Sequence, residues 1–209
     1  MQKAYYVNNR KRLYQHMDAG SLLAIFSGEE LWKCGDEYFP FFADRNFVYL
    51  TGLKCKSAVL LAAKDADGSV QERLYLLPPD ALAERWTGAR VKPEEAEAVS
   101  GISDARSVQA FERDFSALAS GGKYEKIYLD LYRYTPEQPD RPSHRLLRRI
   151  RKDFAYLSIG NAEDILRSLR LIKQPCEIEA LRKAEAITRE GILAMMRSSH
   201  PGKYEYQYK

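Results

Sequence analysis

The sequence has few of the residues that build metal centres and disulfide scaffolds. It contains three histidines and three cysteines in 209 residues. The histidines show no H-E-x-x-H pattern or comparable ligand spacing, so the residues alone do not predict a metal site. The cysteines form no C-x-x-C pair, and an odd number at wide spacing is a poor basis for a disulfide framework. These six residues are His16, His144, His200, Cys34, Cys55 and Cys176. We therefore expect a cytoplasmic protein.

Long apolar runs and the common catalytic loops are also missing. The longest apolar stretches, such as Ser57–Ala63, are far too short to span a bilayer, and the first 17 residues lack the apolar core of a signal peptide. No G-x-S-x-G serine elbow is present. Gly121 and Gly122 precede a strand candidate, whereas phosphate-binding glycine loops follow one. We expect no membrane contact, no covalent serine catalyst and no phosphate loop.

The composition is that of a globular chain. Hydrophobic residues make up 45% of it, and 33 basic residues against 29 acidic ones give a net charge of +4. This mild excess does not imply a nucleic-acid partner. One basic segment, Arg145–Lys152, could contact phosphates, but it also carries an apolar stripe and no interleaved aromatic residues. A surface amphipathic helix is the favoured interpretation, and we expect no nucleic acid.

Short strands alternate with amphipathic helices along the chain. The strand candidates are Leu22–Phe26, Phe47–Thr51, Ala58–Ala63, Arg73–Leu77, Ile127–Leu131 and Tyr156–Ser158. The helix candidates are Arg10–Met17 with Asn8 or Asn9 as cap, Pro93–Val99, Val108–Leu118, 146–154, Asn161–Leu169 and Cys176–Arg197. The segment 65–68, D-A-D-G, resembles a calcium loop only superficially and is predicted to be a hairpin turn. The pattern predicts an α/β fold with a mixed β-sheet flanked by helices.

Two further segments stand out. Residues 38–52 are densely aromatic, and Pro40 followed by the polar residues Asp44, Arg45 and Asn46 predicts a shaped loop before a strand. The helix Cys176–Arg197 has extensive apolar surface. We expect that surface to pack against something, and dimerisation through it is one prediction.

The aromatic segment, with Asp36 ahead of it, resembles the signature of the N-terminal domain of the aminopeptidase P, prolidase and creatinase family, D-x-x-Y-P-F/Y and then D/N-F-x-Y-L/F-T-G. The sequence departs from many Xaa-Pro aminopeptidases at Phe42, where they carry Arg, and at Asn46, where they carry Asp. Further similar stretches follow in the expected order: Met17–Ser21, Glu84–Arg90, Leu169–Lys173, Glu177-Ile178, Leu181–Ala184 and Pro201–Tyr206.

This resemblance implies a domain organisation. Residues 1–168 would form a creatinase/aminopeptidase P N-terminal domain, and residues 169–209 a linker and the first helix of a truncated pita-bread catalytic domain. In such relatives two Asp, one His and two Glu bind a pair of divalent metals, often manganese. All five ligands would lie beyond Lys209, so we expect no metal, no catalytic residue and no activity of the 209-residue chain alone.

The resemblance also implies a function. The parent would be a Xaa-Pro aminopeptidase, favoured over prolidase, that releases the N-terminal residue from peptides with penultimate proline. This domain would support homo-oligomerisation and cap the active site of a neighbouring subunit. Trp86 would supply an apolar wall there and Asp36 a polar contact to the peptide amino terminus. Two alternatives stay open: a buried core position for Trp86, and a free-standing binding or assembly module without peptidase activity.

Overall fold

The computed structural model describes residues 1–208 and divides the chain into two units, Met1–Leu169 and Arg170–Lys209. The first unit holds a six-stranded sheet in the order β6-β5-β4-β1-β7-β8 and a separate two-stranded hairpin of β2 and β3. The strands are β1 (Ser21–Phe26), β2 (Trp32–Cys34), β3 (Glu37–Tyr38), β4 (Val59–Lys64), β5 (Val70–Leu76), β6 (Ala105–Ser107), β7 (Lys126–Leu129) and β8 (Ser158–Asn161).

The six-stranded sheet is mixed. β1 pairs antiparallel with β4 and parallel with β7, which in turn pairs parallel with β8. β4 and β5 form an antiparallel hairpin, and its turn is closed by the Asp65 amide donating to the Ser69 carbonyl at 2.8 Å. The predicted α/β fold and the predicted hairpin turn at 65–68 are confirmed.

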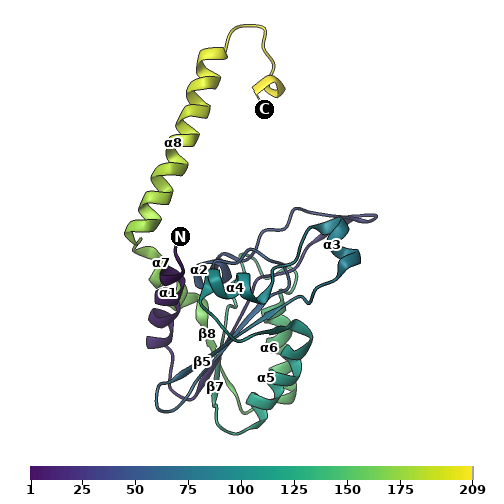
Figure 1. The fold of residues 1–209 in the computed structure, drawn as a ribbon, viewed down its shortest axis with the longest axis vertical. Helices are drawn as coiled ribbons and strands as arrows, with labels where there is room; N and C mark the ends of the chain where they lie inside the picture. The colour runs from purple at the N-terminus through teal and green to yellow at the C-terminus, as the bar shows by residue number, and fades with distance from the viewer. Residues whose placement is uncertain (209) are drawn as a thin grey trace. The chain divides into compact units, whose positions relative to one another are not determined.

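Helices cover the sheet on two sides (Figure 1). α5 and α6 lie on one face, while α1, α2 and α4 pack against one another and α2 contacts β1. Because both faces are covered, β1 is a continuous apolar run from Leu22 to Phe26 and does not alternate between apolar and polar residues. The helices of this unit are α1 (Lys3–Gln15), α2 (Arg45–Thr51), α3 (Ala81–Thr87), α4 (Pro93–Ser100), the 3₁₀ turn η1 (Val108–Ala110), α5 (Phe111–Ser120), α6 (Pro142–Asp153) and most of α7 (Ala162–Leu171), whose last two residues belong to the second unit.

The core under α5 and α6 is aromatic and aliphatic. Phe111 contacts Tyr75 and Phe115, and Phe115 contacts Phe154, all within about 6 Å between ring centroids. Leu146 and Ile150 bury the apolar stripe of α6 in the same cluster. The interpretation of Arg145–Lys152 as part of an amphipathic helix is therefore confirmed.

The predicted strand Phe47–Thr51 is wrong, because this segment is the helix α2. The Asp44 carboxylate caps its first turn by accepting from the Asn46 and Phe47 amides, and Gly52 ends it in a left-handed conformation with φ of 77°. The Thr51 hydroxyl donates back to the Phe47 carbonyl at 2.8 Å. Local capping and burial thus override the strand preference of aromatic and β-branched residues.

The first helix begins earlier than predicted. α1 starts at Lys3, so Asn8 and Asn9 lie inside it and do not cap it. The Asn9 side chain donates to the Tyr49 carbonyl at 2.9 Å. A buried asparagine that binds another element looks like a cap when only the sequence is read, and this is the source of the error.

Arg10 links α1 to three other elements through hydrogen bonds. Its side chain is 1% exposed and forms two hydrogen bonds with the Glu72 carboxylate of β5, at 2.8 and 3.2 Å. Its Nη1 donates to the carbonyls of Leu50 and Ser100 at 2.8 and 2.9 Å. These carbonyls lie in the last turns of α2 and α4, where a cation is favoured by the helix dipole. The guanidinium therefore supplies hydrogen-bond donors to carbonyls in the last turns of two helices.

The short elements β2, β3, β6 and α3 were not predicted. α3 depends on a cap, because the Asp80 carboxylate accepts from the Leu82 and Ala83 amides at 3.1 Å each. β2 and β3 are exposed and only two or three residues long. Elements this short leave no periodic pattern that a sequence argument can use.

The second unit contains the long helix α8 (Pro175–Ser198) and the 3₁₀ turn η2 (Glu205–Tyr208). Pro175 is the first residue of α8, and the Glu177 carboxylate accepts a hydrogen bond from the Gln174 amide at 2.9 Å. No residue of α8 is buried. Its exposed apolar residues are Ile178, Leu181, Ile187, Ile192, Met195 and Met196. Among residues 1–208, no helix combines the length and apolar character that a membrane crossing requires.

Candidate functional site

A cavity lies at the carboxyl ends of the neighbouring parallel strands β1 and β7. From β1 the chain continues to β4 on one side, and from β7 it continues through α6 to β8 on the other side. Connections that leave adjacent parallel strands in opposite directions open a crevice between them, which is where open α/β sheets bind ligands. We call this cavity the switch-point pocket.

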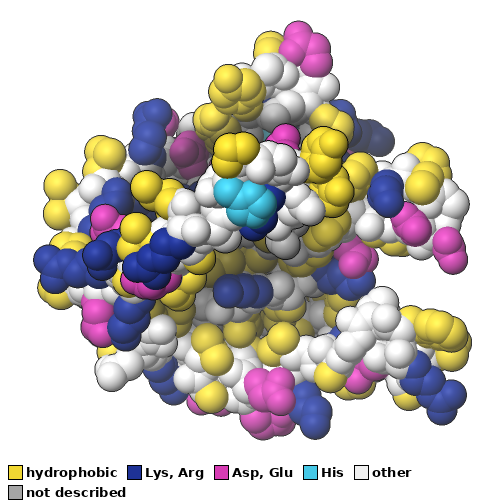
Figure 2. Space-filling view, turned by 90° about the horizontal axis from the view of Figure 1, so that it is seen from above, with side chains coloured by type: hydrophobic (Ala, Val, Ile, Leu, Met, Phe, Trp, Pro, Cys, Tyr) yellow, Lys and Arg dark blue, Asp and Glu magenta, His cyan; other side chains and the backbone are white. Residues whose placement is uncertain are grey.

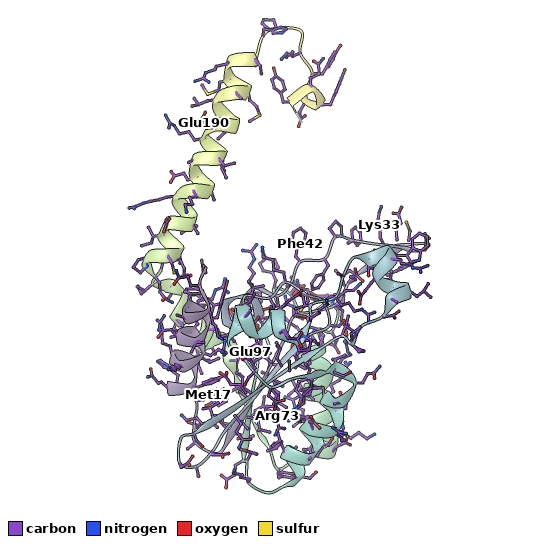
Figure 3. The ribbon with its side chains drawn as sticks, viewed as in Figure 1. Met17, Lys33, Phe42, Arg73, Glu97 and Glu190 are labelled. Carbon is purple, nitrogen blue, oxygen red and sulfur yellow. The ribbon has the colours of Figure 1, made fainter. Side chains whose placement is uncertain are left out.

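The switch-point pocket has a volume of about 370 Å³. One wall follows β1 and includes Phe26, Gly28 and Leu31, and the other includes Asp130 and the segment that opens α6. Phe42 also lines it, with its side chain 87% exposed, and lies on the loop above the strand ends (Figure 3). The remaining lining residues are Ser27, Glu29, Asp44, Gln138, Pro139, Asp140, Arg141, Pro142 and Ser143.

Asp44 is a partly buried carboxylate in this lining. One oxygen caps α2, and the other lies 3.5 Å from Arg141 Nη1, at the long limit of a hydrogen bond. Burial, and then the negative charge of Asp130, raise the pKa of Asp44 above its usual value, although the amides of Asn46 and Phe47 and the charge of Arg141 act against this.

Asp130 is 6% exposed and lies directly after β7. Its Oδ2 accepts from Asn46 Nδ2 at 2.8 Å, and its Oδ1 accepts from the Tyr132 amide at 3.2 Å. The same Asn46 nitrogen donates to Glu163 Oε2 at 2.8 Å. One amide group thus links two carboxylates, which an Asp at position 46 would repel.

Three arginines of α6 form ion pairs with nearby carboxylates. Arg145 pairs with Glu29 at 2.6 Å, and Arg148 pairs with Asp140. Arg149 pairs with Glu112 of α5. These ion pairs reduce the positive charge that the helix presents to solvent.

The two residues predicted to contact substrate lie outside the switch-point pocket. Asp36 is exposed in the turn between β2 and β3, directly after Gly35, whose φ is 54°. Trp86 is on α3 and is 85% exposed, so the alternative of a buried core indole is wrong. The hairpin and α3 reach furthest to the right in Figure 1, and the view from above shows two separate projections on that side (Figure 2).

Large apolar side chains are exposed on these projections and on the adjoining loop. They are Leu31, Trp32, Tyr38, Phe39, Phe42, Leu82 and Trp86, and we call them the apolar rim. Sequence reasoning found the aromatic density of residues 38–52 but did not predict that Tyr38, Phe39 and Phe42 are exposed. The signal that was available is that residues 38–43, Y-F-P-F-F-A, contain a proline and have no regular period, which a buried strand or helix would show.

Sequence reasoning also missed Asp130 and Glu163. Asp130 was counted inside the strand candidate Ile127–Leu131, whereas β7 ends at Leu129. An acidic residue directly after a buried apolar strand is a usable signal for the functional edge of an α/β sheet. Asn46 was noted only as a departure from a motif.

The described residues do not fit a metal centre. In residues 1–208, no three His, Cys, Asp or Glu side chains are grouped so that they could hold a metal ion. The dinuclear metal that the resemblance implies therefore finds no ligand set in this part of the chain, and we assign no chemical step to it here.

Comparison with known proteins gives a consistent result. Residues 6–128 match the family model for the aminopeptidase P N-terminal domain. Xaa-Pro aminopeptidase of Haemophilus influenzae is 29% identical over 207 residues, covering 98% of this chain and 45% of the relative. The Escherichia coli Xaa-Pro aminopeptidase is 26% identical over 198 residues, covering 94% of this chain and 45% of the relative.

Solved structures agree with these matches. A putative aminopeptidase P from Bacillus anthracis has a TM-score of 0.95 at 27% identity, covering all of this chain and 49% of its own. Aminopeptidase P from Escherichia coli with the inhibitor Pro-Leu has a TM-score of 0.86 at 23% identity, covering all of this chain and 47% of its own, and shows the shared fold. The chain thus spans just under half the length of the relatives that it matches.

Proposed function

This chain belongs to the family of aminopeptidase P N-terminal domains, and from that premise we propose that it serves as the non-catalytic N-terminal part of a Xaa-Pro aminopeptidase. The proposed parent activity is release of the N-terminal residue from peptides with penultimate proline. Residues 1–168 would be the accessory domain, and residues 169–209 the linker and first helix of the catalytic domain. The names and lengths of the relatives support this assignment, because each has more than half of its chain beyond the matched part.

The apolar rim is the observation that supports a capping role. Seven large apolar side chains are exposed on the hairpin, α3 and the adjoining loop, and tryptophan and tyrosine are among the residues most enriched at the energetic centres of interfaces. The rim therefore fits a surface that is covered in the working protein. We propose that it closes over the active site of a neighbouring subunit.

The two projections suggest distinct roles within that cap. Trp86 on α3 would supply a flat apolar wall for a proline-containing peptide, since its indole is almost fully accessible. Asp36 in the hairpin turn would pair with the peptide ammonium group, since its carboxylate is exposed and negatively charged. The remaining apolar residues of the rim would exclude water from the peptide.

The hydrolytic chemistry would belong to residues outside the described chain. Those residues would hold the divalent cations, proposed to be manganese, that would supply Lewis-acid chemistry. The described residues contribute shape and charge to substrate selection in this proposal. Cytoplasmic location and homo-oligomer assembly, with the exposed apolar residues of α8 as one contact surface, belong to the same proposal.

Peptide hydrolysis by two proteins tests the proposal. A longer product of the same gene, assayed beside the 209-residue chain with and without manganese, should release arginine from Arg-Pro-Pro, and the 209-residue chain should not. In the longer protein, Trp86→Ala and Asp36→Ala should each lower kcat/KM by roughly tenfold without lowering Tm. Tyr134→Ala is a matched control, because Tyr134 is an exposed aromatic residue that belongs neither to the apolar rim nor to the switch-point pocket.

Three outcomes would change the conclusion. Manganese-dependent activity in the 209-residue chain would mean that it holds a metal site of its own. Unchanged kcat/KM in both Trp86→Ala and Asp36→Ala would remove the capping role. Inactivity of both proteins would favour the alternative of a free-standing binding or assembly module.

A further inference from the structure

The switch-point pocket is distinct from the two residues assigned to substrate contact, although Leu31 and Phe42 of the apolar rim form part of its edge. Its lining contains neither Asp36 nor Trp86. Its volume of about 370 Å³ falls within the range of small-molecule sites, roughly 300–1,000 Å³. Its place between the carboxyl ends of β1 and β7 follows from the strand order, so the fold itself creates it.

The carboxylates around the pocket differ in whether a cation forms an ion pair with them. Glu29 is paired with Arg145, and Asp140 accepts from Arg133 and pairs with Arg148. Asp130 differs from them, because no cation among residues 1–208 forms an ion pair with it. Asp130 accepts hydrogen bonds from the neutral Asn46 side chain and from the Tyr132 backbone amide.

Asp44 has only a distant cationic partner. Its one cationic partner, Arg141, lies 3.5 Å away and has a side chain that is 44% exposed. An exposed guanidinium at this distance is weakly held and leaves room for a competing cation. The Asp130 charge acts on Asp44 and disfavours its ionised form, which is the electrostatic condition that a bound positive charge would relieve.

Apolar and aromatic groups complete the lining. Phe26 lies at the end of β1, Leu31 and Phe42 come from the loop that follows, and Pro139 and Pro142 come from the opposite wall. Aromatic faces attract ammonium and guanidinium groups, and the aliphatic side chains suit an apolar stem. A simple hydrated metal ion would gain nothing from such walls.

We propose that the switch-point pocket binds an organic cation, an ammonium or guanidinium group on an apolar stem, between the carboxylates of Asp44 and Asp130. Each carboxylate retains lone pairs beyond its present hydrogen bonds, so both accept from the ligand without giving up Asn46 or the α2 cap. Arg141 moves away from Asp44 as the ligand enters, and Phe42 covers the bound group.

NMR titration of the ¹⁵N-labelled 209-residue chain with N-acetyl-arginine amide tests this proposal. The amide signals of Gly28 and Tyr132 should shift in a saturable way. N-acetyl-citrulline amide, the neutral isostere, should bind roughly tenfold or more weakly, because it lacks the charge. Alaninamide, which carries only an α-ammonium group, distinguishes a peptide amino terminus from a basic side chain as the source of the cation.

Asp44→Asn is the decisive variant, and Asp80→Asn is its matched control. Both aspartates cap seven-residue helices through two amides, and both lie 3.5 Å from an arginine Nη. Asparagine preserves the cap in each case. Asp44→Asn should weaken binding of the arginine derivative roughly tenfold, and Asp80→Asn should leave it unchanged.

A second variant keeps the test independent of local folding. Phe42→Ala removes an exposed aromatic side chain and should weaken binding by about three- to fivefold through the lost cation–π contact. The proposal is overturned if neither cation shifts the signals at about 20 mM, if citrulline and arginine derivatives bind equally, or if Asp44→Asn and Asp80→Asn behave alike. Because the 209-residue chain is titrated alone, failure of the capping proposal would not affect this result.

Discussion

Carboxylates at the two ends of the central sheet differ in their partners and in the direction of their pKa shifts. At the amino ends of β1 and β7, Lys126 and Tyr128 contact Asp18, and Lys123 and Tyr124 contact Asp65. These contacts, from the lysine first and then the tyrosine, lower the pKa of each carboxyl group.

At the carboxyl ends the situation is reversed. Burial and the Asp130 charge raise the pKa of Asp44, and Asp130 has no ion-pair partner among the described residues. The comparison indicates that Asp18 and Asp65 at the amino ends support folding, whereas Asp44 and Asp130 at the carboxyl ends are available to a ligand. Removing a charge that has a close ion-pair partner should therefore lower the free energy of unfolding, and removing a charge without one should not.

The largest effect is expected at the most completely matched charge, that of Arg10. Arg10→Met should lower the free energy of unfolding by about 3–5 kcal/mol, because it leaves Glu72 without its buried partner and leaves two helix-terminal carbonyls without the hydrogen bonds that Arg10 donates. Urea unfolding followed by circular dichroism measures this change. Lys11→Met, at the neighbouring exposed position, should stay within about 0.5 kcal/mol.

A double variant separates charge from packing. Glu72→Gln in the Arg10→Met background should recover part of the loss, since it removes the unpaired carboxylate. A loss below about 1 kcal/mol for Arg10→Met would contradict the view that this ion pair fastens α1 to the domain.

A smaller effect is expected at the amino ends of the strands. Asp65→Asn should lower stability less than Arg10→Met does, because it removes the ion pair with Lys123 and weakens the hydrogen bond from Tyr124. The folded-state pKa of Asp65 is lowered, so its contribution is present above the unfolded pKa and is lost as pH falls through the folded value. The variant should therefore lose the part of the acid sensitivity that Asp65 causes. Equal slopes below about pH 4 in both proteins would contradict this.

The sheet could be predicted from sequence because its strands and larger helices are long enough to show a period. Leu22–Phe26 is a continuous apolar run, and Leu146 and Ile150 are spaced for one face of a helix. The family could be recognised from a motif of which Asn46 and Phe47 are part. Motifs of this kind preserve residue identity without stating local structure, and so α2 was mistaken for a strand.

The site was less predictable, because it depends on contacts between distant segments. Asn46 lies 84 residues from Asp130 and 117 from Glu163, and no local pattern relates the three. The exposure of Trp86 depends on α3 projecting from the sheet, which its sequence does not reveal. Asp36 and Trp86 were proposed from motif position alone, and their roles stay predictions.

The smallest change in stability is expected at Asp44, and its sign distinguishes the two ends of the sheet. The folded-state pKa of Asp44 is raised, so its ionisation opposes folding: stability is highest below the unfolded pKa, about 3.9, and declines as pH rises through the folded value. Asp44→Asn should remove that decline while keeping the α2 cap, so the free energy of unfolding at neutral pH should stay within about 0.5 kcal/mol of the parent or rise slightly. Unfolding measured from pH 3 to 7, beside Asp65→Asn, gives both slopes. If Asp44→Asn destabilised the protein at neutral pH as Asp65→Asn does, Asp44 would be a matched structural charge, and the contrast between the two ends would fail.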